Sequence, residues 1–166
     1  MKVYQVLTAL LLTSSILSAC SNPPSEDSPI NKTSGFAKVT TPYEPETAAH
    51  NGDVVNVHET LLNMEIWGEF LNNVKKKTED QVRVTTYTIE GSPIFFELIY
   101  DRDDIHYTLD NSMDGFGTDM GRPSTICQGI DIKPDDESNF YYVLTGCEQI
   151  DIGNTFWLPA NVTLKN

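Results

Sequence analysis

The hydrophobic positions of the chain follow a helical period just after its first third. One apolar stripe at three- and four-residue spacing is formed by Ile66, Trp67, Phe70, Leu71 and Val74. This spacing predicts a helix of about three turns. Asn63 precedes the stripe and is expected to be the N-cap of that helix. The valines within residues 53–58 predict a short strand before it.

The pattern then changes to the two-residue period of strands. Three segments, residues 82–90, 94–100 and 105–109, alternate apolar and polar positions and are separated by Gly91-Ser92-Pro93 and by the polar residues 101–104. Strands joined by such short turns form an antiparallel meander. We expect the helix to cover the apolar face of this meander, which makes the fold class α+β.

The N-terminus carries an apolar run that reads as a targeting segment. Residues 6–16 follow the basic Lys2, and Leu17-Ser18-Ala19-Cys20 closes the run. These four residues resemble the lipobox of bacterial lipoproteins, which is cleaved just before the cysteine. Residues 1–19 are therefore expected to be a signal peptide and Cys20 to carry a diacylglyceryl anchor. Simple secretion, with Cys20 as a free thiol, is the alternative.

Composition divides the remaining chain into a tether and one domain. Residues 20–50 are rich in proline, serine, threonine and acids, which predicts a disordered tether behind the lipidated cysteine. Residues 51–166 have the length of a single domain. The tail of this domain, residues 148–166, contains Phe156-Trp157-Leu158 before Pro159. The tail either adds an edge strand ended by that proline, which we favour, or packs loosely on the sheet.

Cys127 and Cys147 are the two cysteines left after lipidation. Their midpoint lies within the polar residues 133–139, which separate expected strands at residues 126–132 and 140–145. A hairpin folded there places the cysteines opposite each other, and export makes oxidation favourable. The full expectation is one helix packed on an antiparallel β-meander, with a C-terminal disulfide-linked hairpin.

The net charge of the chain limits the classes of partner that it can bind. The formal net charge is −13, which argues against nucleic acid, since phosphates require clusters of lysine and arginine. We expect contact with the membrane through the lipid on Cys20, and a protein or a cell-wall component as partner. The expected location is the extracytoplasmic face of the cell membrane.

Few segments have the pattern of a chemical site. The three histidines lack zinc-binding spacing, and no serine lies in a Gly-x-Ser-x-Gly elbow. One loop places Asp110, Ser112 and Asp114 at the first, third and fifth positions of a calcium loop, with glycine at the sixth. Its twelfth residue is Gly121 instead of glutamate. Calcium is the one cofactor considered, and a solvated glycine-rich loop is the alternative.

A set of short matches spans residues 53–147. The most specific is Tyr87-Thr88-Ile89-Glu90-Gly91 followed by Pro93-Ile94; the others include Asn63, Asp110-Asn111, Phe116-Gly117, Cys127 and Gly146-Cys147. Together they resemble a family of uncharacterised Gram-positive lipoproteins that share a domain of unknown function. The resemblance implies no catalytic residue.

Three functional hypotheses follow from the anchor, the tether and the missing catalytic motifs. The first is a non-enzymatic surface module that binds a partner, as an inhibitor, immunity or sensory lipoprotein does. The second is an envelope enzyme that uses carboxylates or His106 in a cleft. The third is a structural protein of the envelope.

Overall fold

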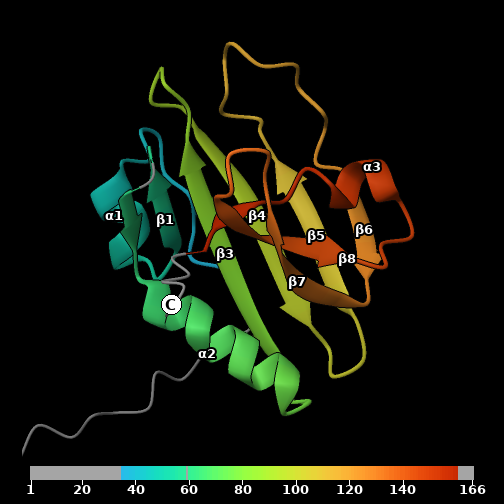
Figure 1. Ribbon diagram of the computed structural model, residues 1–166. Coiled ribbons are helices and arrows are strands. Elements are labelled where there is room, and N and C mark those ends of the chain that lie inside the picture. Colours follow the sequence, from blue (N-terminus) through green and yellow to red (C-terminus); the bar gives the residue numbers. More distant parts are fainter. Residues whose placement is uncertain (1–34, 59, 161–166) are drawn as a thin grey trace, which may run out of the picture. The chain divides into compact units, whose positions relative to one another are not determined.

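The computed structural model describes residues 35–58 and 60–160, and these form three helices and nine strands in two sheets (Figure 1). The expected signal peptide and the lipid site Cys20 lie outside the described residues. Among the residues described, no helix is both long and apolar enough to cross a membrane. The α+β class is confirmed.

The larger sheet has six strands in the order β2-β1-β3-β4-β5-β6. Their bounds are Val54–Val57 for β1, Thr60–Leu62 for β2, Asp80–Tyr87 for β3, Pro93–Tyr100 for β4, Ile105–Asp110 for β5 and Ser124–Cys127 for β6. The predicted antiparallel meander is confirmed in β3, β4 and β5. The pairing of β1 with β3 is parallel and was not predicted. A parallel pair is joined through an intervening helix, here α2.

Alternation along the strands gives this sheet two different faces. The core face carries Val84, Leu98 and Tyr107, which are fully buried, and the opposite face carries Arg83 and Glu97. On the core face, α2 (Met64–Lys75) buries Trp67 and Phe70, as the apolar stripe predicted. The helix therefore packs on the meander through the apolar stripe predicted from its sequence.

Asn63 differs in part from its predicted role. It precedes α2, but its backbone is left-handed, with φ 59°, and its side chain does not cap the helix. The amide nitrogen instead donates to the carbonyls of Ala49 and Asp53, each at 2.8 Å. The side chain thus links the start of α2 to the turn before β1. It makes no hydrogen bond to the backbone N–H groups at the start of the helix.

The smaller sheet consists of β7 (Gly129–Pro134), β8 (Phe140–Thr145) and β9 (Leu158–Pro159). It lies across the core face of the larger sheet (Figure 1). The short helix α3 (Ile150–Gly153) precedes β9. The tail therefore adds an edge strand that ends at Pro159, which is the alternative that the sequence favoured. Phe156, just before this strand, is 1% exposed and belongs to the core.

The strand predicted at residues 126–132 is divided between the two sheets. β6 ends at Cys127 and β7 begins at Gly129. Cys127 and Ile130 both contact the core, although they are three residues apart. An unbroken strand would put them on opposite faces, so the break lets both side chains turn inward.

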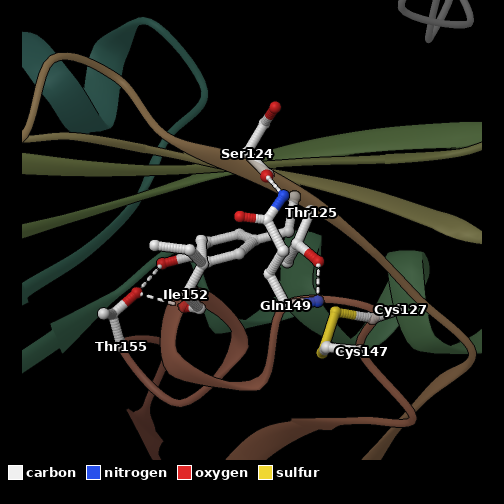
Figure 2. Close-up of a disulfide and its surroundings, with 8 residues drawn as sticks. Ser124, Thr125, Cys127, Cys147, Gln149, Ile152 and Thr155 are labelled. Carbon is white, nitrogen blue, oxygen red and sulfur yellow. Dashed lines mark hydrogen bonds between the residues drawn. A yellow bond between two sulfur atoms is a disulfide. The ribbon is translucent and has the colours of Figure 1, made fainter.

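The predicted disulfide between Cys127 and Cys147 is confirmed (Figure 2). It joins the end of β6 to the segment after β8. Backbone hydrogen bonds flank it, from Gln128 N to Thr145 O at 3.0 Å and from Glu148 N to Ile126 O at 2.9 Å. The bond therefore ties the smaller sheet to the larger one.

Loss of this bond should destabilise the domain. We expect the double variant Cys127→Ala/Cys147→Ala to lose about 3 kcal/mol of unfolding free energy, because it opens a loop with a sequence separation of 20 residues. Urea unfolding of the variant and the wild type measures the difference. Reduced wild type should match the variant, and equal midpoints for oxidised wild type and variant would contradict this role.

The expected tether differs from the structure over its last part. Residues 35–50 belong to the same compact unit as the sheets. They comprise an N-terminal arm, residues 35–43, and the helix α1 (Pro45–His50). Tyr43 and Ala48 are buried there against Val55 and Phe95 on the face opposite the core face, which we call the arm face. The prediction of a tether was wrong here because it rested on the polar, proline-rich composition of the whole segment, which does not reveal two buried side chains.

Candidate functional site

A pocket of about 460 Å³ opens on the arm face, between the N-terminal arm and the loop after β5. Its apolar walls come from Phe36, Ala37, Val39, Phe95 and Met113. Its polar groups belong to Arg83, Glu97, Asp110, Ser112 and Arg122. A concave site with apolar walls and a few converging polar groups is the usual form of a ligand site.

The strands place three of the polar side chains on one face. Arg83 on β3 lies directly opposite Glu97 on β4, and Asp110 on β5 lies opposite Phe95. Glu97 and Asp110 are thus diagonal neighbours in adjacent antiparallel strands. In each strand these charged residues alternate with residues that face the core, which is why they share the arm face.

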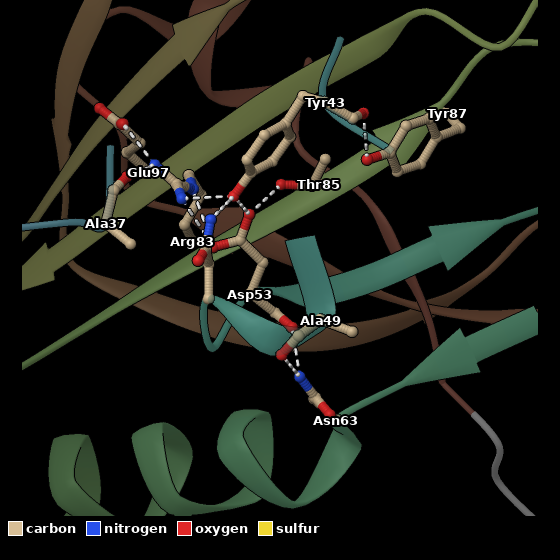
Figure 3. A network of polar contacts seen from close by, with 10 residues as sticks. Ala37, Tyr43, Ala49, Asp53, Asn63, Arg83, Thr85, Tyr87 and Glu97 are labelled. Carbon is tan, nitrogen blue, oxygen red and sulfur yellow. Dashed lines mark hydrogen bonds and ion pairs between the residues drawn. The ribbon is translucent and has the colours of Figure 1, made fainter. Parts of the chain in front are cut away.

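The floor of the pocket rests on a buried ion pair between Arg83 and Asp53 (Figure 3). The side chains are 2% and 3% exposed, and Arg83 contacts Asp53 Oδ1 through Nε and through Nη2, each at 2.9 Å. Asp53 Oδ2 accepts hydrogen bonds from Tyr43 at 2.9 Å and from Thr85 at 2.7 Å. Both carboxylate oxygens therefore have buried donors, which such a charge requires.

Arg83 also fastens the N-terminal arm to the sheet. Its Nη1 donates to the carbonyl of Ala37 at 2.9 Å, and its Nη2 donates to the hydroxyl of Tyr43 at 2.8 Å. Its Cζ lies 5.6 Å from the ring centroids of Phe36 and Tyr43. Burial lowers the pKa of Arg83, but its contacts with Asp53 outweigh this effect and hold the pKa above the ordinary value. Arg83 is therefore a fixed cation of the framework.

Arg122 closes the rim of the pocket. It comes from the loop after β5, and its guanidinium contacts Glu97 Oε2 at 2.7 Å and Asp110 Oδ2 at 3.1 Å. The two carboxylate side chains are 17% and 13% exposed, whereas Arg122 is 53% exposed. Burial raises the pKa of Glu97, and Arg122 opposes this rise. Two mostly buried carboxylates thus contact one exposed guanidinium.

The residues proposed as a calcium loop are only partly brought together. Asp110 and Ser112 line the pocket, and Asp110 is directed to Arg122. Asp114 instead accepts a hydrogen bond from the N–H of Phe116 at 3.1 Å. Within residues 35–58 and 60–160, no group of three or more His, Cys, Asp or Glu side chains is arranged to hold a metal. Calcium binding stays a prediction, which a melting temperature unchanged by millimolar calcium would exclude.

His106, the histidine considered for catalysis, lies outside the pocket. As predicted, it faces away from the core, and its Nε2 lies 2.7 Å from Asp101 Oδ2 in an exposed pair. Hydrogen bonds from the backbone of Asp104, with help from His106, hold the pKa of Asp101 well below its usual range. This carboxylate therefore stays ionised and serves the turn between β4 and β5.

Sequence reasoning missed the residues that build the floor and rim. None of Asp53, Arg83, Glu97 and Arg122 was predicted to belong to a site, and Tyr43 was assigned to the tether. Arg83 stands between Val82 and Val84 in a predicted strand. A charge between two apolar neighbours is the ordinary alternation of a strand with one solvated face, so this pattern does not reveal that Arg83 is buried.

A second concave surface lies on the outer side of the smaller sheet. It has a volume of about 340 Å³ and is lined by Lys133, Pro134, Asp135, Tyr141, Val143 and Trp157. The rings of Tyr141 and Trp157 meet edge to face at 5.6 Å. This surface is mostly apolar and shallow, whereas the pocket on the arm face combines apolar walls with buried charges.

Comparison with known proteins agrees with the predicted resemblance to a family that shares a domain of unknown function. A family model described as "Domain of unknown function (DUF4362)" matches residues 51–142. No curated protein and no solved structure matches the chain. The matched range includes Asp53, Arg83, Glu97, Asp110 and Arg122, which form the floor and rim of the pocket. Because the match covers more than half of the chain, the protein belongs to the family of the domain of unknown function DUF4362.

Proposed function

We propose that this protein is a lipoprotein anchored through Cys20 on the extracytoplasmic face of a bacterial membrane, and that its domain binds a partner in the pocket on the arm face. The pocket is the observation that carries the proposal, because it combines about 460 Å³ of volume with apolar walls and converging charges. The segment Leu17-Ser18-Ala19-Cys20 supports the anchor. The resemblance to Gram-positive lipoproteins agrees with the anchor.

The state of the charged groups favours binding over catalysis. A general base needs a carboxylate or imidazole that can reach a proton of the substrate. In the pocket, Glu97 and Asp110 both contact Arg122, and Arg83 is committed to Asp53 and to the arm. These ion pairs fix the shape of the pocket and the positions of its charges. We therefore place the protein among non-enzymatic binding modules.

Site-specific photocrosslinking in intact cells tests this function. A crosslinking amino acid is placed in the full-length protein at Ser112, which lines the pocket, or at Ile150, an exposed residue of α3. We expect a discrete adduct from position 112 that position 150 does not give. The further substitution Ala37→Trp, which fills the pocket, should abolish that adduct, while Cys20→Ser should move the protein from the membrane to the medium.

Two results would count against the proposal. The same adducts from positions 112 and 150 would show that the pocket has no partner of its own. Persistence of the 112 adduct after Ala37→Trp would show that the contact lies outside the pocket. A thermal unfolding curve of the Ala37→Trp protein that matches the wild type is the control for folding.

A further inference from the structure

Without Arg122, the floor and rim of the pocket would hold one cation, Arg83, against three carboxylates. Asp53 is neutralised by Arg83, with which it shares two contacts at 2.9 Å. Arg83 reaches Glu97 only at 4.0 Å. Among the described residues, Arg122 is therefore the cation that lies closest to both Glu97 and Asp110. If that guanidinium left, two neighbouring carboxylates would remain beside an apolar wall, which is the environment that most favours a cation.

Arg122 is held less firmly than the groups that it serves. Its side chain is 53% exposed and belongs to a loop, while the two carboxylates belong to strands and are mostly covered. Ion pairs that involve such an exposed side chain are weak, since water and salt compete for the cation. Another cation can therefore replace Arg122, whereas Glu97 and Asp110 are held in place by their strands.

The walls of the pocket suit a long basic side chain. The rings of Phe36 and Phe95 already make cation–π contacts with Arg83, whose Cζ lies 5.6 Å and 5.7 Å from their centroids. The same aromatic groups line the pocket together with Val39 and Met113. Aromatic faces attract cations, and the methylene stem of lysine or arginine packs on apolar surface.

We propose that the pocket recognises a basic side chain of a peptide or protein partner, whose guanidinium or ammonium group takes the place of Arg122 between Glu97 and Asp110. This proposal rests on the proposed function and names the chemical class of its ligand. Arg122 is then an internal competitor that occupies the pair of carboxylates at the rim until the partner binds. The net charge of −13 draws such a basic partner toward the domain.

A divalent cation fits the pocket less well than a basic side chain. Calcium requires six to eight oxygen ligands. The rim offers the carboxylates of Glu97 and Asp110 with Ser112 nearby, and the described part of the chain holds no cluster of three acidic or histidine side chains suited to a metal. A guanidinium needs only the two carboxylates, as the contacts of Arg122 show.

Calorimetric titration of the purified full-length protein tests the proposal. The probe is a short neutral peptide with one central arginine, and its matched control has citrulline, the uncharged isostere of arginine, at that place. We expect the arginine peptide to bind and the citrulline peptide not to bind. Arg122→Ala should tighten binding of the arginine peptide about tenfold, because it removes the competitor. Glu97→Gln should weaken it about tenfold or more.

Arg102→Ala is the matched control for Arg122→Ala. Arg102 is also exposed and also pairs with a glutamate, Glu79, so its loss changes the net charge equally, but it lies in the turn at the other end of β4 and β5. We expect it to leave the affinity unchanged. Equal effects of the two arginine variants, or equal binding of the citrulline peptide, would overturn the proposal. If Glu97→Gln fails to fold, Asp110→Asn replaces it.

The two proposals fail in different ways. A pocket-specific adduct in cells, together with a purified protein that ignores the arginine peptide, would keep the binding function and reject the basic ligand. Binding of a glutamate-containing peptide in place of the arginine peptide would have the same meaning. Absence of any pocket-specific adduct in cells would reject the proposed function itself.

Discussion

Replacing Asp53 with asparagine is expected to lower the free energy of unfolding by about 3–5 kcal/mol, the effect of breaking a buried ion pair from one side. The substitution keeps the shape of the side chain but removes its charge. Arg83, 2% exposed, would then be a buried cation whose second carboxylate, Glu97, lies 4.0 Å away. The amide would also present donors to Tyr43 and Thr85, which now donate to Asp53. Urea unfolding measures the loss.

The exposed pair of Glu79 and Arg102 supplies the control for this prediction. The two side chains are 61% and 62% exposed and lie 3.0 Å apart. Glu79→Gln removes the same charge at the surface, so we expect a loss of less than about 1 kcal/mol. If Asp53→Asn were as mild as Glu79→Gln, the buried network would not be what holds the N-terminal arm and the pocket floor.

Truncating Phe156 to alanine is expected to lower the free energy of unfolding by about 3–5 kcal/mol, as for other large aromatic side chains in cores. Phe156 is 1% exposed, and its ring contacts those of Trp67, Phe96 and Tyr107 with centroids 5.8, 5.7 and 5.9 Å away. It therefore links α2 on one side to β4 and β5 on the other. The alanine would leave a cavity between them. Denaturant unfolding again gives the size of the effect.

The neighbouring Trp157 makes a close control, because it is as large but points outward. It is 43% exposed and contacts Tyr141 on the outer side of the smaller sheet. We expect Trp157→Ala to cost less than about 1 kcal/mol. Similar losses for the two variants would show that the tail does not complete the core. Since Phe156 lies beyond the matched family range of residues 51–142, the comparison also shows whether the tail is part of the folding unit.

The elements that sequence reasoning predicted correctly are those with local signals. The stripe around Trp67 and Phe70 has the helical period, and the meander has short turns between alternating strands. The disulfide followed from two cysteines placed symmetrically about a polar turn. In each case the partners are close in sequence or repeat at a fixed spacing, so the pattern itself contains the structure.

The features that escaped prediction depend on partners far apart in the sequence. Asp53 and Arg83 are 30 residues apart, and Arg83 and Ala37 are 46 apart. Neither pair has a periodic signal, and the parallel pairing of β1 with β3 that brings Asp53 beside Arg83 has none either. Composition reports average burial and therefore predicted a tether, whereas the position of the arm depends on specific contacts of Ala37 and Tyr43 with Arg83.

The candidate site was predicted in fragments. Asp110 and Ser112 were selected for their oxygen atoms and do line the pocket. Their partner Arg122 follows Gly121 in a loop, where no periodicity indicates the direction of a side chain. The spacing of oxygen ligands therefore drew attention to the right loop, while the contacts of Arg122 with Glu97 and Asp110 required the structure.

The most direct measurement of the central claim follows the two arginines by NMR while the arginine peptide is added to the full-length protein. The guanidinium N–H signals of Arg83 and Arg122 report separately on the framework and on the rim, where Arg122 pairs through Nη2 and Nη1. We predict that the Arg122 signal moves to the position of a solvent-exposed arginine as the peptide binds, while the Arg83 signal stays that of a buried, paired arginine. A bound peptide with Arg122 still paired, or no binding at all, would contradict the account.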